Sequence, residues 1–259
     1  MAGFALSTEA EPPQRLRVLD ACTANDEPTT RGTLGTCGTT GTFGTHYGYL
    51  MTMRATLFVV LALAAAGPSA QSLPTLQPLD AKGRVTYYIA DGEPGSHFQP
   101  FDRELAVWAL RAWERSLGGA LTFAPAREED ALVRVYFVPA SVGQYGEMRS
   151  LLVKGRRGAA VYVRPDTDAL GGDIARLARK DPLLRDTIVY LTCVHELGHA
   201  LGLGHTADFR DIMYFFGYGG DIPAFFTRYR EQLTRRDDIR NVSGLSAGDV
   251  ERVVALYRK

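Results

Sequence analysis

Hydrophobic and polar positions predict an alternation of strands and helices across residues 83–259. Four segments are rich in the β-branched and aromatic residues that favour strands: 84–89, 120–126, 131–140 and 158–166. The third of these alternates most clearly, and the fourth ends in a turn at Pro165-Asp166. Strands that alternate with helices, without an internal repeat, are typical of a single α/β domain of this size.

Helices are marked by their periodicity and by the residues at their ends. An apolar stripe of helical spacing through 101–117 predicts the first helix. Asp181 and Pro182 suit the N-cap and the first position of a second helix, which should run to about Gly202. A capping box that begins at Ser246 predicts a last helix close to the C-terminus.

The first 50 residues show neither the hydrophobic period of a strand nor that of a helix. They include a Gly/Thr-rich run that cannot bury a core. We expect residues 1–50 to be a mis-assigned start, with synthesis beginning at Met51 or Met53. A genuine disordered leader is the alternative.

A signal-like segment follows at residues 51–70. A basic residue, a short apolar run and then small residues are typical of a secretory signal peptide, and the run is too short to span a bilayer. Cleavage could follow Ala66 or Ala70, whereas a buried core helix is disfavoured by the prolines just beyond. We expect 71–82 to be a linker and 83–259 to be the domain.

The composition argues against nucleic acid as a partner. The 29 basic and 29 acidic residues balance, and no basic patch is interleaved with aromatics, so nucleic acid is not an expected partner.

Hydrophobic residues make up 46% of the chain, enough for one substantial core. Beyond residue 50 the only cysteine is Cys193, so no intramolecular disulfide is expected, and Cys193 should pack in the core.

The stretch "VHELGHALGLGHTADFRDIMY" contains a candidate metal site. His195 and His199 are four residues apart on the expected helix, so their imidazoles lie on one face. Gly202 allows a sharp turn, after which His205 can return as a third ligand. Three imidazoles on Zn²⁺ leave a fourth position open for water, which distinguishes a catalytic site from a structural one. Glu196 lies beside that face and can take a proton from such a water.

"HELGHALGLGH" fits the pattern H-E-x-x-H-x-x-G-x-x-H at every fixed position. The sequence here resembles the metzincin clan of zinc endopeptidases and, within it, the matrixins. The resemblance implies one catalytic Zn²⁺ per chain, held by His195, His199 and His205, with Glu196 as the general base. "DIMY" resembles the Met-turn of the clan, which implies that Met213 lies beneath the metal.

The likeness extends over most of 83–259. "AVWALRAWERSLGGALTF" looks like the first matrixin helix with the strand after it, and "LSAGDVERVVALY" looks like the C-terminal helix. The resemblance implies an α/β, zincin-like fold with a twisted, mostly parallel sheet and an antiparallel edge strand above the zinc helix. We expect "GAAVYVR", residues 158–164, to be an edge strand that holds an extended peptide by main-chain hydrogen bonds.

An acidic stretch and the residue two positions after Met213 distinguish this sequence from the family pattern. Asp166, Asp168 and Asp173 could bind Ca²⁺, although such a stretch is more often a plain polar loop. Phe215 stands where matrixins carry a proline after the Met-turn.

A further apolar face of helical spacing lies in "PAFFTRYREQL", residues 223–233. Phe225 and Phe226 on this face either line the pocket for the residue after the cleaved bond or pack on the core.

We therefore expect a secreted zinc-dependent endopeptidase, extracellular or periplasmic, that acts on proteins or peptides such as those of an extracellular matrix. The mature form should be a monomer without a stable membrane span. One alternative is a zinc hydrolase of non-peptide amides. Another is a secreted zinc-binding module that has lost turnover, against which the intact Glu196 argues.

Overall fold

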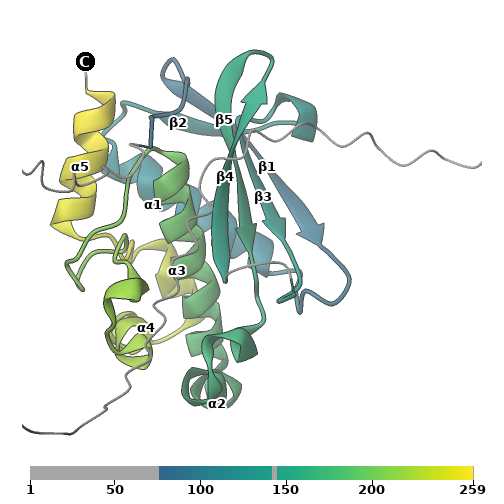
Figure 1. Cartoon of the computed structure of the whole chain (residues 1–259), viewed down its shortest axis with the longest axis vertical. Coiled ribbons are helices and arrows are strands. Elements are labelled where there is room, and N and C mark those ends of the chain that lie inside the picture. Colours follow the sequence, from purple (N-terminus) through teal and green to yellow (C-terminus); the bar gives the residue numbers. More distant parts are fainter. Residues whose placement is uncertain (1–75, 142–144, 259) are drawn as a thin grey trace, which may run out of the picture. The chain divides into compact units, whose positions relative to one another are not determined.

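The computed structural model describes residues 76–141 and 145–258. The strands are β1 (Arg84–Gly92), β2 (Thr122–Pro125), β3 (Val133–Phe137), β4 (Gly146–Val153) and β5 (Arg156–Val163). The helices are α1 (Asp102–Ser116), α2 (Gly172–Lys180), α3 (Pro182–Ala200), α4 (Ile222–Arg230) and α5 (Ala247–Tyr257). Figure 1 shows these elements as labelled ribbons.

The five strands form one sheet in the order β2-β1-β3-β5-β4. All neighbours are parallel except β4, which pairs antiparallel with β5. The predicted α/β fold, with a mostly parallel sheet and an antiparallel edge strand, is therefore confirmed.

The prediction that residues 158–164 form an edge strand is wrong. These residues belong to β5, which lies between β3 and β4, and the edge strand is β4. No strand was predicted at 146–153, because "GEMRSLLV" has no clear alternation. A signal was nevertheless present at Lys154-Gly155, a two-residue hairpin turn in which both residues have positive φ (50° and 76°).

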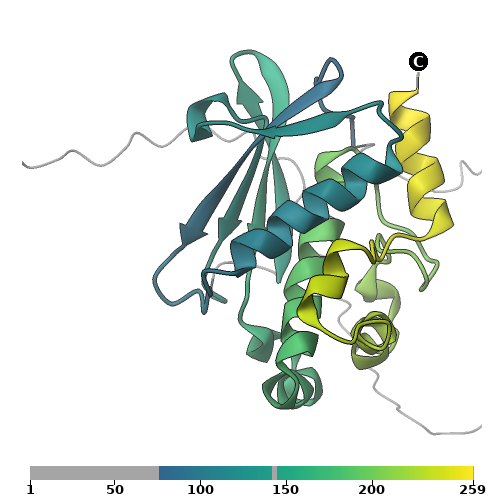
Figure 2. The same ribbon diagram turned by 180° about the vertical axis from the view of Figure 1, so that it is seen from behind.

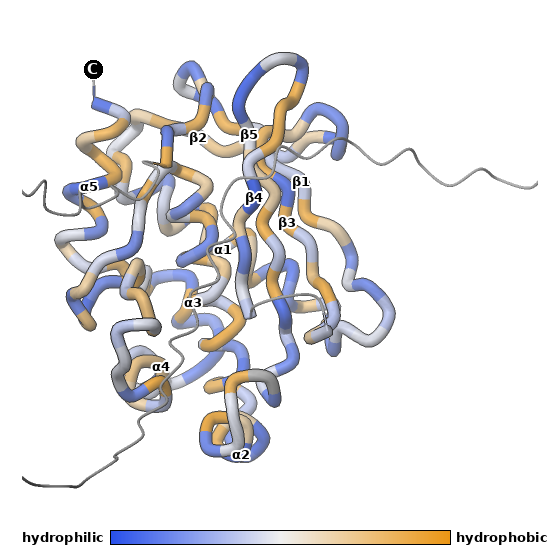
Figure 3. The backbone as a smooth tube through the Cα atoms, in the orientation of Figure 1, coloured by the Kyte–Doolittle hydropathy of each residue, from blue (hydrophilic) through white to orange (hydrophobic). Residues whose placement is uncertain are grey.

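One face of the sheet is buried and the other is only partly covered. On β3, Val133, Val135 and Phe137 are buried, while Arg134 and Tyr136 between them are partly exposed. This alternation follows from the two-residue period of a strand, and the hydropathy colouring in Figure 3 shows it along the strands.

Helices α1 and α3 pack against each other and contribute to the same core as the buried face of the sheet (Figures 1 and 2). The indole Nε1 of Trp113, on α1, donates a hydrogen bond to the carbonyl oxygen of Val194, on α3, at 3.0 Å. As predicted, α3 begins after the N-cap Asp181, whose side chain accepts from two amides of the first turn. A single helix, α3, thus connects the core to the predicted ligands.

The remaining helices differ in how well they were predicted. The capping box at Ser246 begins α5, as expected. The apolar face of 223–233 belongs to α4 and buries Phe225 and Phe226. Helix α2 was not predicted.

The expected leader (1–50) and signal segment (51–70) lie outside the described residues. Residues 76–82, expected to be part of a linker, contribute Leu79 and Ala81 to the core. In the part of the chain that the structure describes, no helix is both long and apolar enough to cross a membrane.

Candidate metal centre

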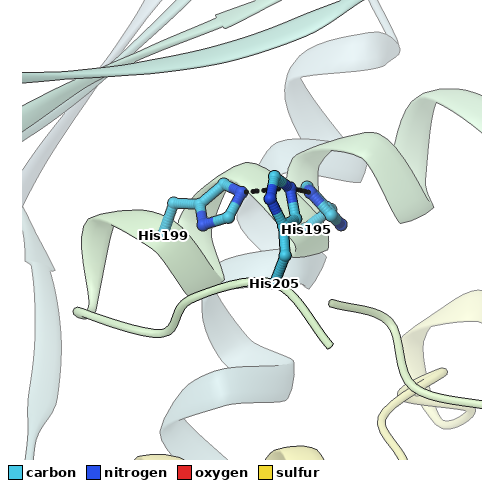
Figure 4. A group of neighbouring side chains, drawn as sticks. All are labelled: His195, His199 and His205. Atoms are coloured by element: carbon cyan, nitrogen blue, oxygen red, sulfur yellow. Dashed lines mark hydrogen bonds between the residues drawn. The ribbon is translucent and has the colours of Figure 1, made fainter. Parts of the chain in front are cut away.

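Helix α3 and the turn after it bring the three predicted histidines together (Figure 4). His195 and His199 lie one turn apart on α3. The helix ends at Ala200, and Gly202 adopts φ of 102°, a backbone conformation that favours glycine. The chain can then return so that His205 faces the other two rings.

The three Nε2 atoms converge. The Nε2 atom of His205 lies 3.3 Å from that of His195 and 3.1 Å from that of His199. Three nitrogens bound to a tetrahedral Zn²⁺ at about 2.0–2.1 Å would lie roughly 3.3 Å apart. The donor set and its spacing therefore fit a zinc ion.

Backbone carbonyls orient two of these rings. The Nδ1 atom of His195 lies 2.6 Å from the carbonyl oxygen of Ile212, and that of His199 lies 2.8 Å from the carbonyl oxygen of Leu203. A hydrogen bond at Nδ1 leaves Nε2 unprotonated and directed inward, as a metal ligand requires. Burial, reinforced by His199, also lowers the pKa of His195 to about 3, so this ring is neutral at pH 7.

Glu196 lies beside the histidine cluster and is not one of its members. Its side chain is buried, and a methyl group placed on Gly146 would clash with Oε1, so the carboxylate lies against the start of β4. Burial raises the pKa of Glu196 to about 8; the charge of Glu147 adds to this rise and Arg164 opposes it. The carboxyl group therefore has a strong affinity for a proton.

The expected Met-turn packs against the helix that carries His195 and His199. Met213 is fully buried, and its sulfur packs against α3 at Gly198, the residue before His199. The neighbouring Ile212 amide donates to the buried carboxylate of Asp249 at 2.8 Å. Helix α5 therefore supports the same segment whose carbonyl orients His195.

The aromatic residues after the Met-turn divide into a buried set and an exposed pair. Phe225 and Phe226 are 3% and 4% exposed, and both pack against Phe216. Phe215 and Tyr218 are 42% and 63% exposed. Phe215 lies against His205, so the aromatic ring beside the metal site comes from the exposed pair and not from α4.

The acidic loop at 166–173 gives no support to a calcium site. Asp168 pairs with Arg179 and Asp173 pairs with Arg176. The carboxylate of Asp166 accepts a hydrogen bond from a nearby backbone amide. Within the described residues, the histidine triad is the only convergent group of three or more potential metal-ligating side chains.

The sequence did not reveal two parts of this site. The first is β4, whose hairpin turn was its only clear signal. The second is the contact between Phe215 and His205, for which the sequence offers no signal because the two residues are ten positions apart and meet through a loop.

A mostly parallel sheet with an antiparallel edge strand, combined with a helix that gathers three imidazoles, defines the metzincin class of domain. A model of the matrixin family matches residues 80–245, which is more than half of the chain. The chain therefore belongs to the matrixin family.

Two known proteins are similar to this chain. Macrophage metalloelastase from Oryctolagus cuniculus is 29% identical over 178 residues, which cover 66% of this chain and 34% of the relative. The chain thus spans about a third of that relative's length. The crystal structure of archaemetzincin from Methanopyrus kandleri is 16% identical and covers 68% of this chain and 96% of that one, with a TM-score of 0.37.

Proposed function

We propose that the protein is a zinc-dependent endopeptidase with one catalytic zinc per chain. The observation that carries this proposal is the convergence of three Nε2 atoms, with Glu196 next to His195 on α3 and its buried carboxylate outside the ligand set. Membership of the matrixin family supports the same activity.

Each part of the site has a chemical role in peptide hydrolysis. His195, His199 and His205 would hold the metal. Zinc bound there supplies a Lewis acid that polarises a carbonyl and lowers the pKa of water. Glu196, in its ionised form, accepts the water proton and can pass it to the leaving amine.

The open edge of β4 is suited to hold an extended peptide. The amide of Arg164 donates to the carbonyl of Tyr145 at 3.1 Å, so these residues form a hydrogen-bonded pair between β4 and β5. Since such pairs alternate along an antiparallel ladder, every second amide of β4 points away from β5. These amides belong to Gly146, Met148, Ser150 and Leu152. A substrate paired with them would pass over Glu196, which lies against the Gly146 end of the strand.

The test is a quenched-peptide or casein assay on purified protein, with and without a chelator. Glu196→Ala should reduce kcat by about 10²-fold to 10⁴-fold while retaining one zinc, because the base is not a ligand. His199→Ala should lose the metal. Glu251→Ala, which removes an exposed carboxylate on α5, is the matched control and should leave turnover unchanged.

The outcomes separate the candidate functions. Near-wild-type turnover in Glu196→Ala would contradict the mechanism. A wild-type protein that binds zinc but cleaves no peptide would instead be a binding module, and cleavage restricted to non-peptide amides would indicate the other hydrolase. We further propose that the protein is secreted and acts as a monomer.

A further inference from the structure

The third imidazole is held differently from the other two. His195 and His199 each have a backbone carbonyl at Nδ1. Within the described residues, His205 has hydrogen-bond contacts only with the other two rings, through Nε2. Among the described residues, therefore, no hydrogen bond at Nδ1 fixes the rotation of this imidazole about its side-chain bonds.

Instead of a backbone hydrogen bond at Nδ1, the imidazole of His205 has an aromatic ring beside it. The rings of Phe215 and His205 have centroids 4.7 Å apart and planes inclined at 34°. Separations of 4.5–7 Å with an offset or tilt are the favourable arrangements for two aromatic rings. The exposed His205 is thus supported by a flat apolar surface on one side.

Backbone hydrogen bonds bring the segments that carry these two rings together. The amide of Thr206 donates to the carbonyl of Met213 at 2.8 Å, and the amide of Phe215 donates to the carbonyl of Thr206 at 3.1 Å. These two hydrogen bonds join the residue after His205 to the segment that carries Phe215. Main-chain pairing therefore fixes the position of His205, and the ring of Phe215 is left to fix its orientation.

We propose that Phe215 is a positioning residue for the metal: its ring holds the imidazole of His205 with Nε2 toward the other ligands and keeps water from that side of the site. This inference rests on the zinc site of the proposed function. It concerns how tightly the metal is retained and does not depend on whether the site cleaves peptides.

Tyr218 provides a matched control. It is more exposed than Phe215 and packs against the Phe215 ring, with centroids 5.2 Å apart and an interplanar angle of 87°. It has no ring contact with His205 within the described part of the chain. Tyr218→Ala therefore removes a neighbouring aromatic ring without removing the support of the ligand.

The experiment measures zinc affinity by competition with a chromophoric chelator for the wild type, Phe215→Ala, Phe215→Leu and Tyr218→Ala. Phe215→Ala should raise the zinc Kd about tenfold, the weaker end of what the loss of an outer contact to a ligand costs. Phe215→Leu keeps apolar bulk without a flat ring and should fall between Phe215→Ala and the wild type. Tyr218→Ala should stay within twofold of the wild type.

Two further readouts distinguish positioning from a general loss of stability. Phe215 is 42% exposed, so the urea midpoint of zinc-free Phe215→Ala should match that of zinc-free wild type, while the increase on adding zinc should shrink. The visible spectrum of the cobalt-substituted variant should change in intensity, because it reports ligand geometry.

A zinc Kd for Phe215→Ala within twofold of wild type would overturn the proposal. So would an equal loss of affinity in Tyr218→Ala, or an equal fall in stability with and without zinc. If the affinities shift as expected but Glu196→Ala still cleaves peptides at the wild-type rate, the endopeptidase mechanism fails and the role of Phe215 stands.

Discussion

Asp102 and Arg185 form an ion pair where the N-terminal ends of α1 and α3 meet. The Asp102 side chain is fully buried and that of Arg185 is 12% exposed. Asp102 also accepts a hydrogen bond from the Gln99 amide at 2.8 Å, so its carboxylate is satisfied from both sides. The zinc helix is therefore tied at its first turn to the helix that packs against it.

Removing one partner of this pair should be costly, because the other charge would remain buried without compensation. We expect Asp102→Ala to lower the free energy of unfolding by about 3–5 kcal/mol in urea titrations. Asp91→Ala breaks an ion pair with Arg103 in which Asp91 is 86% exposed, and it should cost less than about 1 kcal/mol. Equal effects from the two substitutions would show that the buried pair does not stabilise the helix junction.

At the scale of elements, β4 at the edge of the sheet is the strand on which we propose that substrate binds. Two residues at this edge allow a controlled comparison, because Met148 and Leu152 both direct their amides outward. Met148 lies two residues from Gly146, which contacts Glu196. Leu152 lies about 13 Å further along, at roughly 3.3 Å per residue.

Proline removes one outward amide at either position and is tolerated on edge strands. Met148→Pro should raise KM about twofold to tenfold, the value of one hydrogen bond, and should leave zinc content unchanged. Leu152→Pro should leave KM for a short peptide unchanged. If steady-state kinetics show the same KM for Met148→Pro as for the wild type, substrate does not pair with this part of the edge.

At the scale of the whole molecule, the residues just before β1 are part of the folded core. Leu79 and Ala81 are buried, and the Leu79 amide donates to the Tyr257 hydroxyl of α5 at 3.0 Å. That hydroxyl in turn donates to the carbonyl of Leu201, at the end of the zinc helix, at 2.8 Å. Any processing of the N-terminal region must therefore leave this segment in place.

The buried position of Leu79 limits where the exported protein can begin. We expect the secreted protein to begin near Gly67 or Gln71, which leaves Leu79 and its contacts intact. N-terminal sequencing of protein recovered from the medium or periplasm provides the measurement. A start within residues 1–50 would contradict a signal segment at 51–70, and a start beyond residue 81 would contradict the role of Leu79.

The sequence predicted the three clustered histidines and much of the fold because these features are local. The spacing of His195 and His199 places both rings on one helical face wherever the helix packs. Asp181 and Ser246 marked helix starts correctly because an N-cap bonds to amides two or three residues away. The carboxylates of 166–173 were harder to interpret, because the arginines that pair with Asp168 and Asp173 lie in a helix that was not predicted.

By itself, then, the sequence determined the helices with clear caps, the alternating strands and the three histidines, since each depends on neighbours within a few residues. Only the tertiary structure decided that β4 and not β5 lies at the edge, and that Phe215 rather than Phe225 faces the metal site. Each of these outcomes depends on which segments pack side by side, and a buried strand or ring has the same local preferences as an exposed one.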